Sequence, residues 1–117
     1  MELKKISEKF TVSPQISPAD MAEIKAAGFR AIICNRPNGE DAGQPPFEEI
    51  ETAAKAVGIE ARYIPVQSSG LTKENVTALK DAMEELEHPV LAYCRSGTRS
   101  ATLWSIHETA QRTTHEN

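Results

Sequence analysis

The chain has 117 residues, a formal net charge of −4, 39% hydrophobic residues and 26% charged residues. This size and composition are typical of a soluble globular protein, and we interpret residues 1–117 as one domain. The mild negative charge argues against a nucleic-acid partner, and every apolar run is shorter than the ~20 residues of a membrane-spanning helix. The amino terminus lacks the apolar core of a signal peptide, and two cysteines make no disulfide framework. We therefore expect a reduced, cytoplasmic protein with no membrane partner.

Strand and helix signals alternate along the first half of the chain. Ser17 and Pro18 form an N-cap followed by a proline at the first helical position, and Gly28 is suited to end that helix. Residues 35–43 are rich in turn formers and predict a loop. The expected elements are a weak strand near 10–12, a helix from 18, a strand at 29–34 and a helix at about 47–57.

The second half of the chain continues this alternation. A strand over roughly 60–66 leads through a loop to a helix that Thr72 caps and that runs to about Glu87. Val90–Tyr93 is a short apolar run typical of a central parallel strand, and the last helix is expected from Ser100 to about Ala110. The pattern predicts an α/β fold, with a parallel sheet, helices on both faces, and ligands bound at the carboxyl ends of the strands.

The strand at 90–93 leads directly into the loop Cys94-Arg95-Ser96-Gly97-Thr98-Arg99 and then into the last helix. A tight turn between a strand and a helix N-terminus directs backbone N–H groups into one concavity, which binds anions. Such a site stabilises a thiolate, so the pKa of Cys94 is expected below the usual value of about 8.5, and the thiolate is the nucleophilic form. Gly97 permits the turn, and Arg99 offers a bidentate grip on a tetrahedral oxyanion. A packing cysteine beside solvated arginines is the alternative, which the coincidence of Cys, Gly, Arg and Ser at one junction disfavours.

Further residues complete the predicted anion site. Thr98 is expected to contribute its backbone N–H, and Ser100 either to cap the helix or to hydrogen-bond the Cys94 sulfur. Arg36 lies at the carboxyl end of the strand predicted at 29–34. It is expected either to shape the anion pocket or to stabilise its own loop. Neither cysteine lies at metal-ligand spacing from a histidine, so no metal or organic cofactor is expected. The predicted catalytic residues are Cys94 and Arg99, and the predicted substrate-binding residues are Arg95, Ser96, Gly97, Thr98, Ser100 and Arg36.

Two families of thiolate enzymes share parts of this pattern. The segment from Cys94 to Ser100 resembles the active-site loop of single-domain rhodaneses, sulfurtransferases whose cysteine carries sulfane sulfur as a persulfide. The order of elements from Tyr63-Ile64-Pro65-Val66 through a long helix to strand, cysteine, loop, arginine, serine and helix is similar instead to dual-specificity-type protein phosphatases.

Nearly the whole chain is similar to a small bacterial domain with a phosphatase-like fold, labelled as a phosphatase or a sulfurtransferase. The matching stretches are 35–40, 43–45 and 91–104. The domain also occurs fused ahead of a metallo-β-lactamase-type persulfide dioxygenase, in proteins called β-lactamase-hydrolase-like. The resemblance implies a three-layer α/β/α fold of the phosphotyrosine-phosphatase type, with a four-stranded, mainly parallel sheet in the order 1-4-2-3. It also implies a persulfide dioxygenase as a candidate partner.

Three departures from the phosphatase pattern favour sulfur chemistry. Phosphatases of this type have five residues between the cysteine and the arginine, whereas four separate Cys94 from Arg99. Tyr93 stands where a histidine normally precedes the phosphatase cysteine. The loop 67–70 lacks the aspartate that acts as general acid in phosphatases, although Glu40 or Asp41 could replace it.

We therefore expect a sulfurtransferase, in which Cys94 attacks thiosulfate or a low-molecular-weight persulfide. Sulfite and thiolates leave readily, so this reaction has less need of a general acid. The alternatives are a cysteine-dependent phosphatase that forms a phosphocysteine, and a non-catalytic domain that binds an anion or carries a persulfide. Cys34 could resolve a persulfide at Cys94, but a buried strand cysteine is the expected role.

Overall fold

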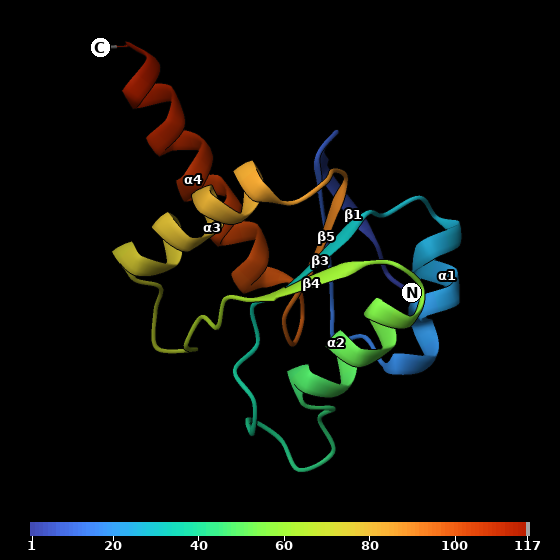
Figure 1. The fold of residues 1–117 in the computed structure, drawn as a ribbon. Helices are drawn as coiled ribbons and strands as arrows, with labels where there is room; N and C mark the ends of the chain where they lie inside the picture. The colour runs from blue at the N-terminus through green and yellow to red at the C-terminus, as the bar shows by residue number, and fades with distance from the viewer. Residues whose placement is uncertain (117) are drawn as a thin grey trace.

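The computed structural model describes residues 1–116, with side chains described through residue 112. The order of elements agrees with the predicted alternation of strands and helices (Figure 1). These elements are β1 (Lys4–Ser7), β2 (Phe10–Ser13), the short helix η1 (Pro18–Asp20), α1 (Met21–Ala26), β3 (Ala31–Cys34), α2 (Phe47–Ala56), β4 (Glu60–Tyr63), α3 (Lys73–Glu85), β5 (Val90–Tyr93) and α4 (Thr98–Glu116).

The sheet has five strands in the order β1-β2-β5-β3-β4. The pairs β2–β5, β5–β3 and β3–β4 are parallel, which confirms the predicted order 1-4-2-3 for the four strands that the sequence indicated. The fifth strand, β1, pairs antiparallel with β2 at the edge of the sheet. We did not predict β1 because three of its four residues are polar and all are at most half-buried, as is usual for a short edge strand.

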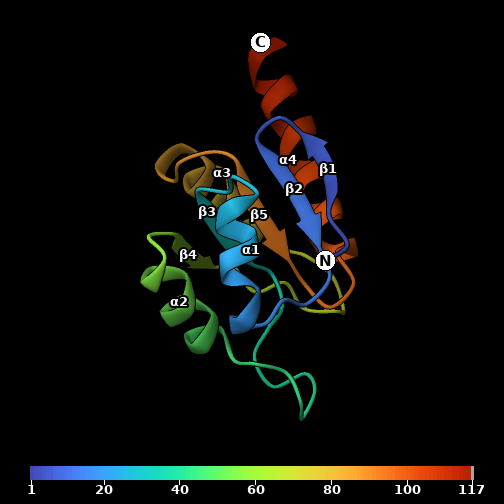
Figure 2. The same ribbon diagram turned by 90° about the vertical axis from the view of Figure 1, so that its right-hand side faces the viewer.

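Helices cover both faces of the sheet (Figures 1 and 2). Helices α1 and α2 lie on one face, and α3 and α4 lie on the other. Side chains of the central strand β5 alternate between the two faces: Val90 and Ala92 join the core under α3 and α4, while Leu91 and Tyr93 join the core under α1 and α2. A strand buried on both faces explains why 90–93 is a continuous apolar run.

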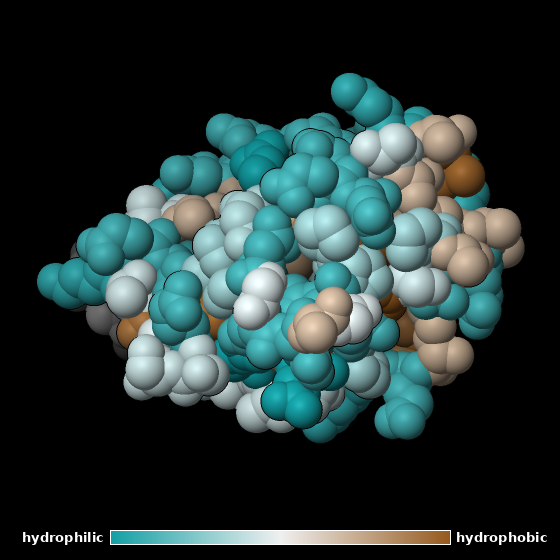
Figure 3. Space-filling model, turned by 90° about the horizontal axis from the view of Figure 1, so that it is seen from below, coloured by the Kyte–Doolittle hydropathy of each residue, from teal (hydrophilic) through white to brown (hydrophobic). Residues whose placement is uncertain are grey.

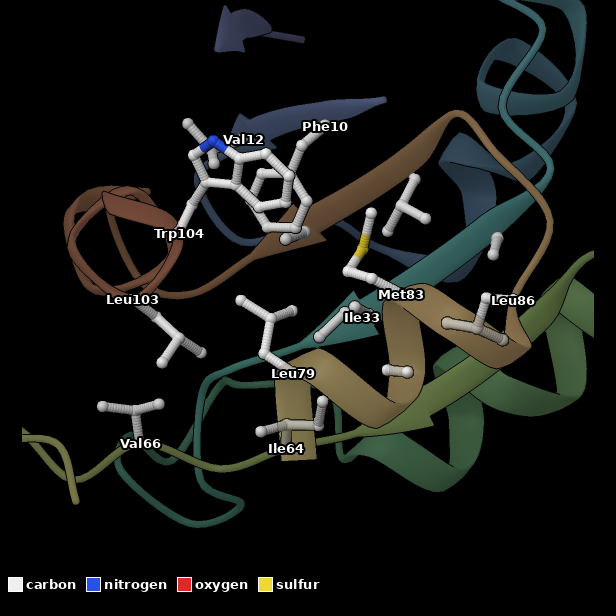
Figure 4. Close-up of a cluster of buried hydrophobic side chains, with 14 residues drawn as sticks. Phe10, Val12, Ile33, Ile64, Val66, Leu79, Met83, Leu86, Leu103 and Trp104 are labelled. Atoms are coloured by element: carbon white, nitrogen blue, oxygen red, sulfur yellow. The ribbon is translucent and has the colours of Figure 1, made fainter. Parts of the chain in front are cut away.

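The core under α3 and α4 is closed by two aromatic rings (Figure 4). Trp104 of α4 stacks on Phe10 of β2 with 4.4 Å between the ring centroids. Leu79 of α3 lies in the middle of this cluster and is fully buried.

We predict that Leu79→Ala destabilises the protein by about 2–5 kcal/mol, because the lost methyl groups leave a cavity that the sheet cannot close. Urea unfolding followed by the fluorescence of Trp104, the chain's one tryptophan, measures the change. A loss below about 0.5 kcal/mol, the range of surface substitutions, would contradict this packing.

The bounds of several elements differ from the sequence prediction. The last helix begins at Thr98, two residues before the predicted start, and continues to Glu116. The strand predicted at 60–66 ends at Tyr63, although Ile64 and Val66 still donate backbone hydrogen bonds to the carbonyl oxygens of Cys34 and Asn35. Within the described residues, no helix combines the length and apolar character needed to cross a membrane.

Candidate active site

Cys94 lies at the carboxyl end of the central strand, where β5 turns into α4. Its side chain is fully buried, and the backbone N–H of Gly97 donates a hydrogen bond to its Sγ at 3.0 Å. Gly97 has φ +94°, a conformation that other residues rarely adopt. The Gly97 carbonyl accepts the first helical hydrogen bond, from Ala101. The N–H groups in the first turn of α4 therefore have no partner within the helix and lie beside the cysteine.

Arg99 lies in that first helical turn, and its guanidinium is held at three points. Its Nη1 donates to Glu40 Oε2 at 2.7 Å and to the Val66 carbonyl at 2.8 Å, and its Nη2 donates to Glu40 Oε1 at 2.8 Å. These bonds connect α4 to two loops that follow β3 and β4. The pKa of Arg99 is raised, first by Glu40 and further by the nearby Cys94 sulfur. The guanidinium thus lies beside the nucleophile.

Arg36 carries a second guanidinium into the same region and is almost fully buried. Its Nε donates to Glu40 Oε1 at 3.1 Å, and its Nη1 donates to Gln15 Oε1 at 3.1 Å. The backbone N–H of Gln15 in turn donates to the carbonyl of Arg95, inside the cysteine loop. Arg36 thus braces its own loop through Glu40 and is linked through Gln15 to the cysteine loop.

The loop that carries Glu40 is anchored at several points. The Asn38 side chain accepts a hydrogen bond from the N–H of Phe47 at the start of α2, and its backbone N–H donates to the Tyr63 hydroxyl. The Gln44 side chain accepts from the N–H of Glu40 and donates to the carbonyl of Pro37. These contacts fix the backbone on both sides of Glu40 and direct its carboxylate toward Arg99.

The two candidate general acids have different surroundings. Hydrogen bonds from Arg99, with a smaller contribution from Arg36, lower the pKa of Glu40 from 4.5 to about 2. Glu40 is therefore ionised at neutral pH and holds no proton to donate. The Asp41 carboxylate is 59% exposed and lies 3.9 Å from Arg36 Nη2. Glu40 and Asp41 were the two possible replacements for the missing aspartate. Among the described residues, Glu40 forms an ion pair with Arg99, whereas Asp41 lies near Arg36 instead.

The lowered pKa of Glu40 predicts an acid-dependent loss of stability. A carboxyl group with a depressed folded-state pKa stabilises the fold above its unfolded pKa of about 4.5, and the contribution is lost as pH falls toward about 2. The stability advantage of the wild type over Glu40→Gln should thus be constant from about pH 6 to 7 and clearly smaller at about pH 3. Urea denaturation of both proteins across this range measures it. An advantage that does not change with pH would contradict the ion pair.

The remaining predicted site residues lie in or beside the cysteine loop. Arg95 and Ser96 are exposed, and Ser96 donates from its Oγ to Thr98 Oγ1 at 3.1 Å. Ser100 is buried, and its Oγ has no hydrogen-bond partner in the described part of the chain. Since α4 begins at Thr98, Ser100 is not the helix cap, and the second predicted role, a bond to the Cys94 sulfur, is not made either.

Cys34 is the buried strand cysteine that we expected. Its side chain belongs to the core under α1 and α2, and its Sγ donates to the carbonyl of Arg36 at 3.2 Å. Burial raises the pKa of the Cys34 thiol. Tyr93 shares this core, and the nearby Cys94 adds a smaller contribution to the raised Cys34 pKa. Both cysteines are free thiols in this structure.

Sequence reasoning missed Gln15 and assigned no arginine partner to Glu40. Gln15 follows β2 at the same edge of the sheet as Cys94, which is the one signal that could have included it.

Viewed from below, the surface is mostly hydrophilic, with most of the hydrophobic residues at one side (Figure 3). No cluster of three potential metal-ligating side chains occurs among the described residues.

A buried cysteine, a loop of N–H donors and an arginine meet at the carboxyl edge of the parallel sheet, which is an arrangement suited to cysteine-based chemistry on an anion. The comparisons assign it more closely. A model of the beta-lactamase hydrolase-like protein, phosphatase-like domain, matches residues 2–111, and the chain belongs to this family.

Named relatives agree with this assignment. The chain is 38% identical over 108 residues to a beta-lactamase hydrolase-like protein of Agrobacterium fabrum, and 31% identical over 108 residues to one of Xylella fastidiosa. In both cases the match covers 92% of this chain but 25% of the relative, so the chain spans about a quarter of their length. The structure of a "putative phosphatase" from Neisseria meningitidis is 36% identical, with a TM-score of 0.86, and the match covers 95% of this chain and 79% of that one.

Proposed function

We propose that the protein is a cysteine-dependent phosphatase that acts on phosphate monoesters. The Cys94 thiolate attacks phosphorus, an S–P bond forms, and the ester P–O bond breaks to release an alcohol or phenol oxygen. Water then attacks the phosphocysteine, the S–P bond breaks, and orthophosphate leaves while the thiolate is restored. This was the alternative in the sequence interpretation, and the phosphatase-like family and the N. meningitidis relative favour it over sulfur transfer.

One observation carries the proposal: hydrogen-bond donors converge on Cys94. The Gly97 N–H donates to the sulfur, the Arg99 guanidinium interacts with it, and α4 begins close by in the chain at Thr98. Donors placed in this way bind the oxygens of a tetrahedral anion and stabilise the charge that develops during transfer.

The lack of a placed general acid sets the expected substrate preference. The loop 67–70 contains no carboxylate, Glu40 is ionised and paired, and Asp41 is exposed. An enzyme with this site favours esters whose leaving group needs little protonation, such as aryl phosphates. Rates across aryl phosphates should therefore rise steeply as the pKa of the leaving phenol falls.

Sulfur transfer is the second candidate, and the short loop favours it. Four residues rather than five separate Cys94 from Arg99. In this reaction the thiolate attacks the outer sulfur of thiosulfate, an S–S bond forms with Cys94, the S–S bond of thiosulfate breaks, and sulfite leaves with the electron pair and without protonation. A thiol or cyanide then removes the outer sulfur and restores the thiolate.

Intact-mass measurement separates these functions. The purified protein is incubated with p-nitrophenyl phosphate and quenched in acid, or incubated with thiosulfate, each beside a Cys94→Ser control. A Cys94-dependent gain of one phosphoryl group, with release of p-nitrophenol, supports the phosphatase. A gain of one sulfur atom that cyanide reverses supports the sulfurtransferase, and sulfur loading without turnover supports a persulfide carrier.

A further inference from the structure

The Glu40 carboxylate is shared by two arginines of the site. Its Oε1 accepts from Arg36 Nε and Arg99 Nη2, and its Oε2 accepts from Arg99 Nη1. Its side chain is 22% exposed, and the Arg36 side chain is 5% exposed. A buried guanidinium needs a compensating charge, which Glu40 supplies. One carboxylate thus offsets part of the charge of two cations beside Cys94.

The bonds of Arg99 to oxygen atoms leave one particular edge of its guanidinium, beside the Cys94 sulfur, without an oxygen partner among the described residues. An arginine has five N–H donors. Glu40 and the Val66 carbonyl use both donors of Nη1 and one of Nη2. In the described part of the chain, the Nε donor and the second Nη2 donor are left without a hydrogen bond to an oxygen. These two donors point in parallel along one side of the group, which is the geometry that grips two oxygens of a phosphate.

We propose that Glu40 is a positioning residue, which holds Arg99 so that its Nε–Nη2 edge is presented to the anion bound over Cys94. The anchors at Asn38 and Gln44 give the loop of Glu40 the fixed position that this role requires. This role is different from that of a general acid, which the sequence had suggested for Glu40. The proposal rests on the proposed function, because it assumes that a tetrahedral oxyanion binds over Cys94.

The direction in which Glu40→Gln changes the affinity for phosphate tests the positioning role of Glu40. Glu40→Gln removes a negative charge from the site, so electrostatics alone predicts tighter binding of an anion. If Glu40 positions Arg99, the released guanidinium loses its orientation and the anion binds more weakly despite the added positive charge. We expect the dissociation constant for orthophosphate to rise about tenfold, as for the loss of one charge-assisted hydrogen bond.

The experiment is a titration of the protein with inorganic orthophosphate, followed by two-dimensional NMR. Asp41→Asn is the matched control, because it removes the same charge one residue away without touching Arg99. We expect that variant to bind phosphate as tightly as the wild type, or slightly more tightly. Glu40→Asp keeps the charge with a shorter reach, and its affinity should lie between those of the wild type and Glu40→Gln.

Repeating the Glu40→Gln substitution in an Arg99→Met variant separates a loss of Arg99 positioning from general damage to the loop of Glu40. In Arg99→Met, Glu40 keeps its bond to Arg36 but has no Arg99 guanidinium to orient, so adding Glu40→Gln should no longer weaken phosphate binding and should tighten it slightly. Equal weakening in both backgrounds would mean that Glu40 only maintains the fold, and tighter binding in the wild-type background would mean that Glu40 competes with the anion. Either result overturns the proposal.

The proposed phosphatase function and the role of Glu40 are tested by different measurements, turnover and binding. Binding of orthophosphate needs no turnover, so a protein that binds phosphate but does not hydrolyse aryl phosphates refutes the phosphatase and leaves the role of Glu40 open to the same test. A wild type that binds neither orthophosphate nor sulfate refutes both.

Discussion

Cys94→Ser is expected to abolish turnover of an aryl phosphate, lowering kcat by at least about 10³-fold. A serine hydroxyl is not ionised at neutral pH, and no histidine or other base is among the residues placed around position 94 to activate it. The Gly97 N–H can still donate to the serine oxygen, so the loop should keep its shape. Release of p-nitrophenol, with circular dichroism to check the fold, measures the effect.

Cys34→Ser is the matched control for the nucleophile. Cys34 is buried as Cys94 is, but it belongs to the core under α1 and α2, and its Sγ donates to the backbone carbonyl of Arg36. A serine there can make the same hydrogen bond, so activity should stay within about twofold of the wild type. Residual activity in Cys94→Ser, or its loss in a folded Cys34→Ser, would show that the nucleophile has been misassigned.

The architecture could be predicted because each of its elements is specified locally. The apolar run 90–93 predicted the central strand, and the Thr72 side chain accepts a hydrogen bond from the Asn75 N–H, as its predicted capping role requires. The order of the four parallel strands came from the resemblance. The edge strand β1 was missed, since its pattern reflects a partner on one side and solvent on the other.

The environment of the nucleophile could not be predicted to the same depth. Glu40 and Arg99 are 59 residues apart, and Arg36 and Gln15 are 21 apart. Side-chain pairs at such separations follow from the register of the sheet and the course of two loops, which no local periodicity encodes. Glu40 was therefore considered as a general acid near the site, a role that it does not fill because its partner Arg99 holds it ionised.

The choice between phosphorus and sulfur shows the same limit. Loop length and the missing aspartate are properties of the sequence, and both favoured sulfur. The family and the N. meningitidis relative favour a phosphatase-like domain. The donors around Cys94 suit a tetrahedral oxyanion of either element. The mass of the covalent intermediate on Cys94 therefore decides between phosphate hydrolysis and sulfur transfer.

Gly97→Ala should reduce both stability and catalysis. Position 97 has φ +94°, which strains any residue with a Cβ, and this Cβ would meet the backbone C and O of Ser13 at 3.4 Å. We expect a loss of about 1–3 kcal/mol in the free energy of unfolding. Relief of the strain would turn the peptide that donates to the Cys94 sulfur, so kcat/KM should fall by about 10²-fold, as for the loss of one oxyanion donor.

Gly28→Ala separates the catalytic effect of this substitution from its effect on stability. Gly28 has φ +96°, nearly the same conformation, but a Cβ there meets no atom within 4 Å, and the residue lies between α1 and β3, away from the cysteine loop. Backbone strain should destabilise both variants, whereas only Gly97→Ala should lose activity when both are assayed well below their unfolding temperatures. If the two variants lose activity equally, the N–H of Gly97 contributes nothing particular to the thiolate. A loss confined to Gly97→Ala would show that the turn after Cys94 serves the chemistry as well as the fold.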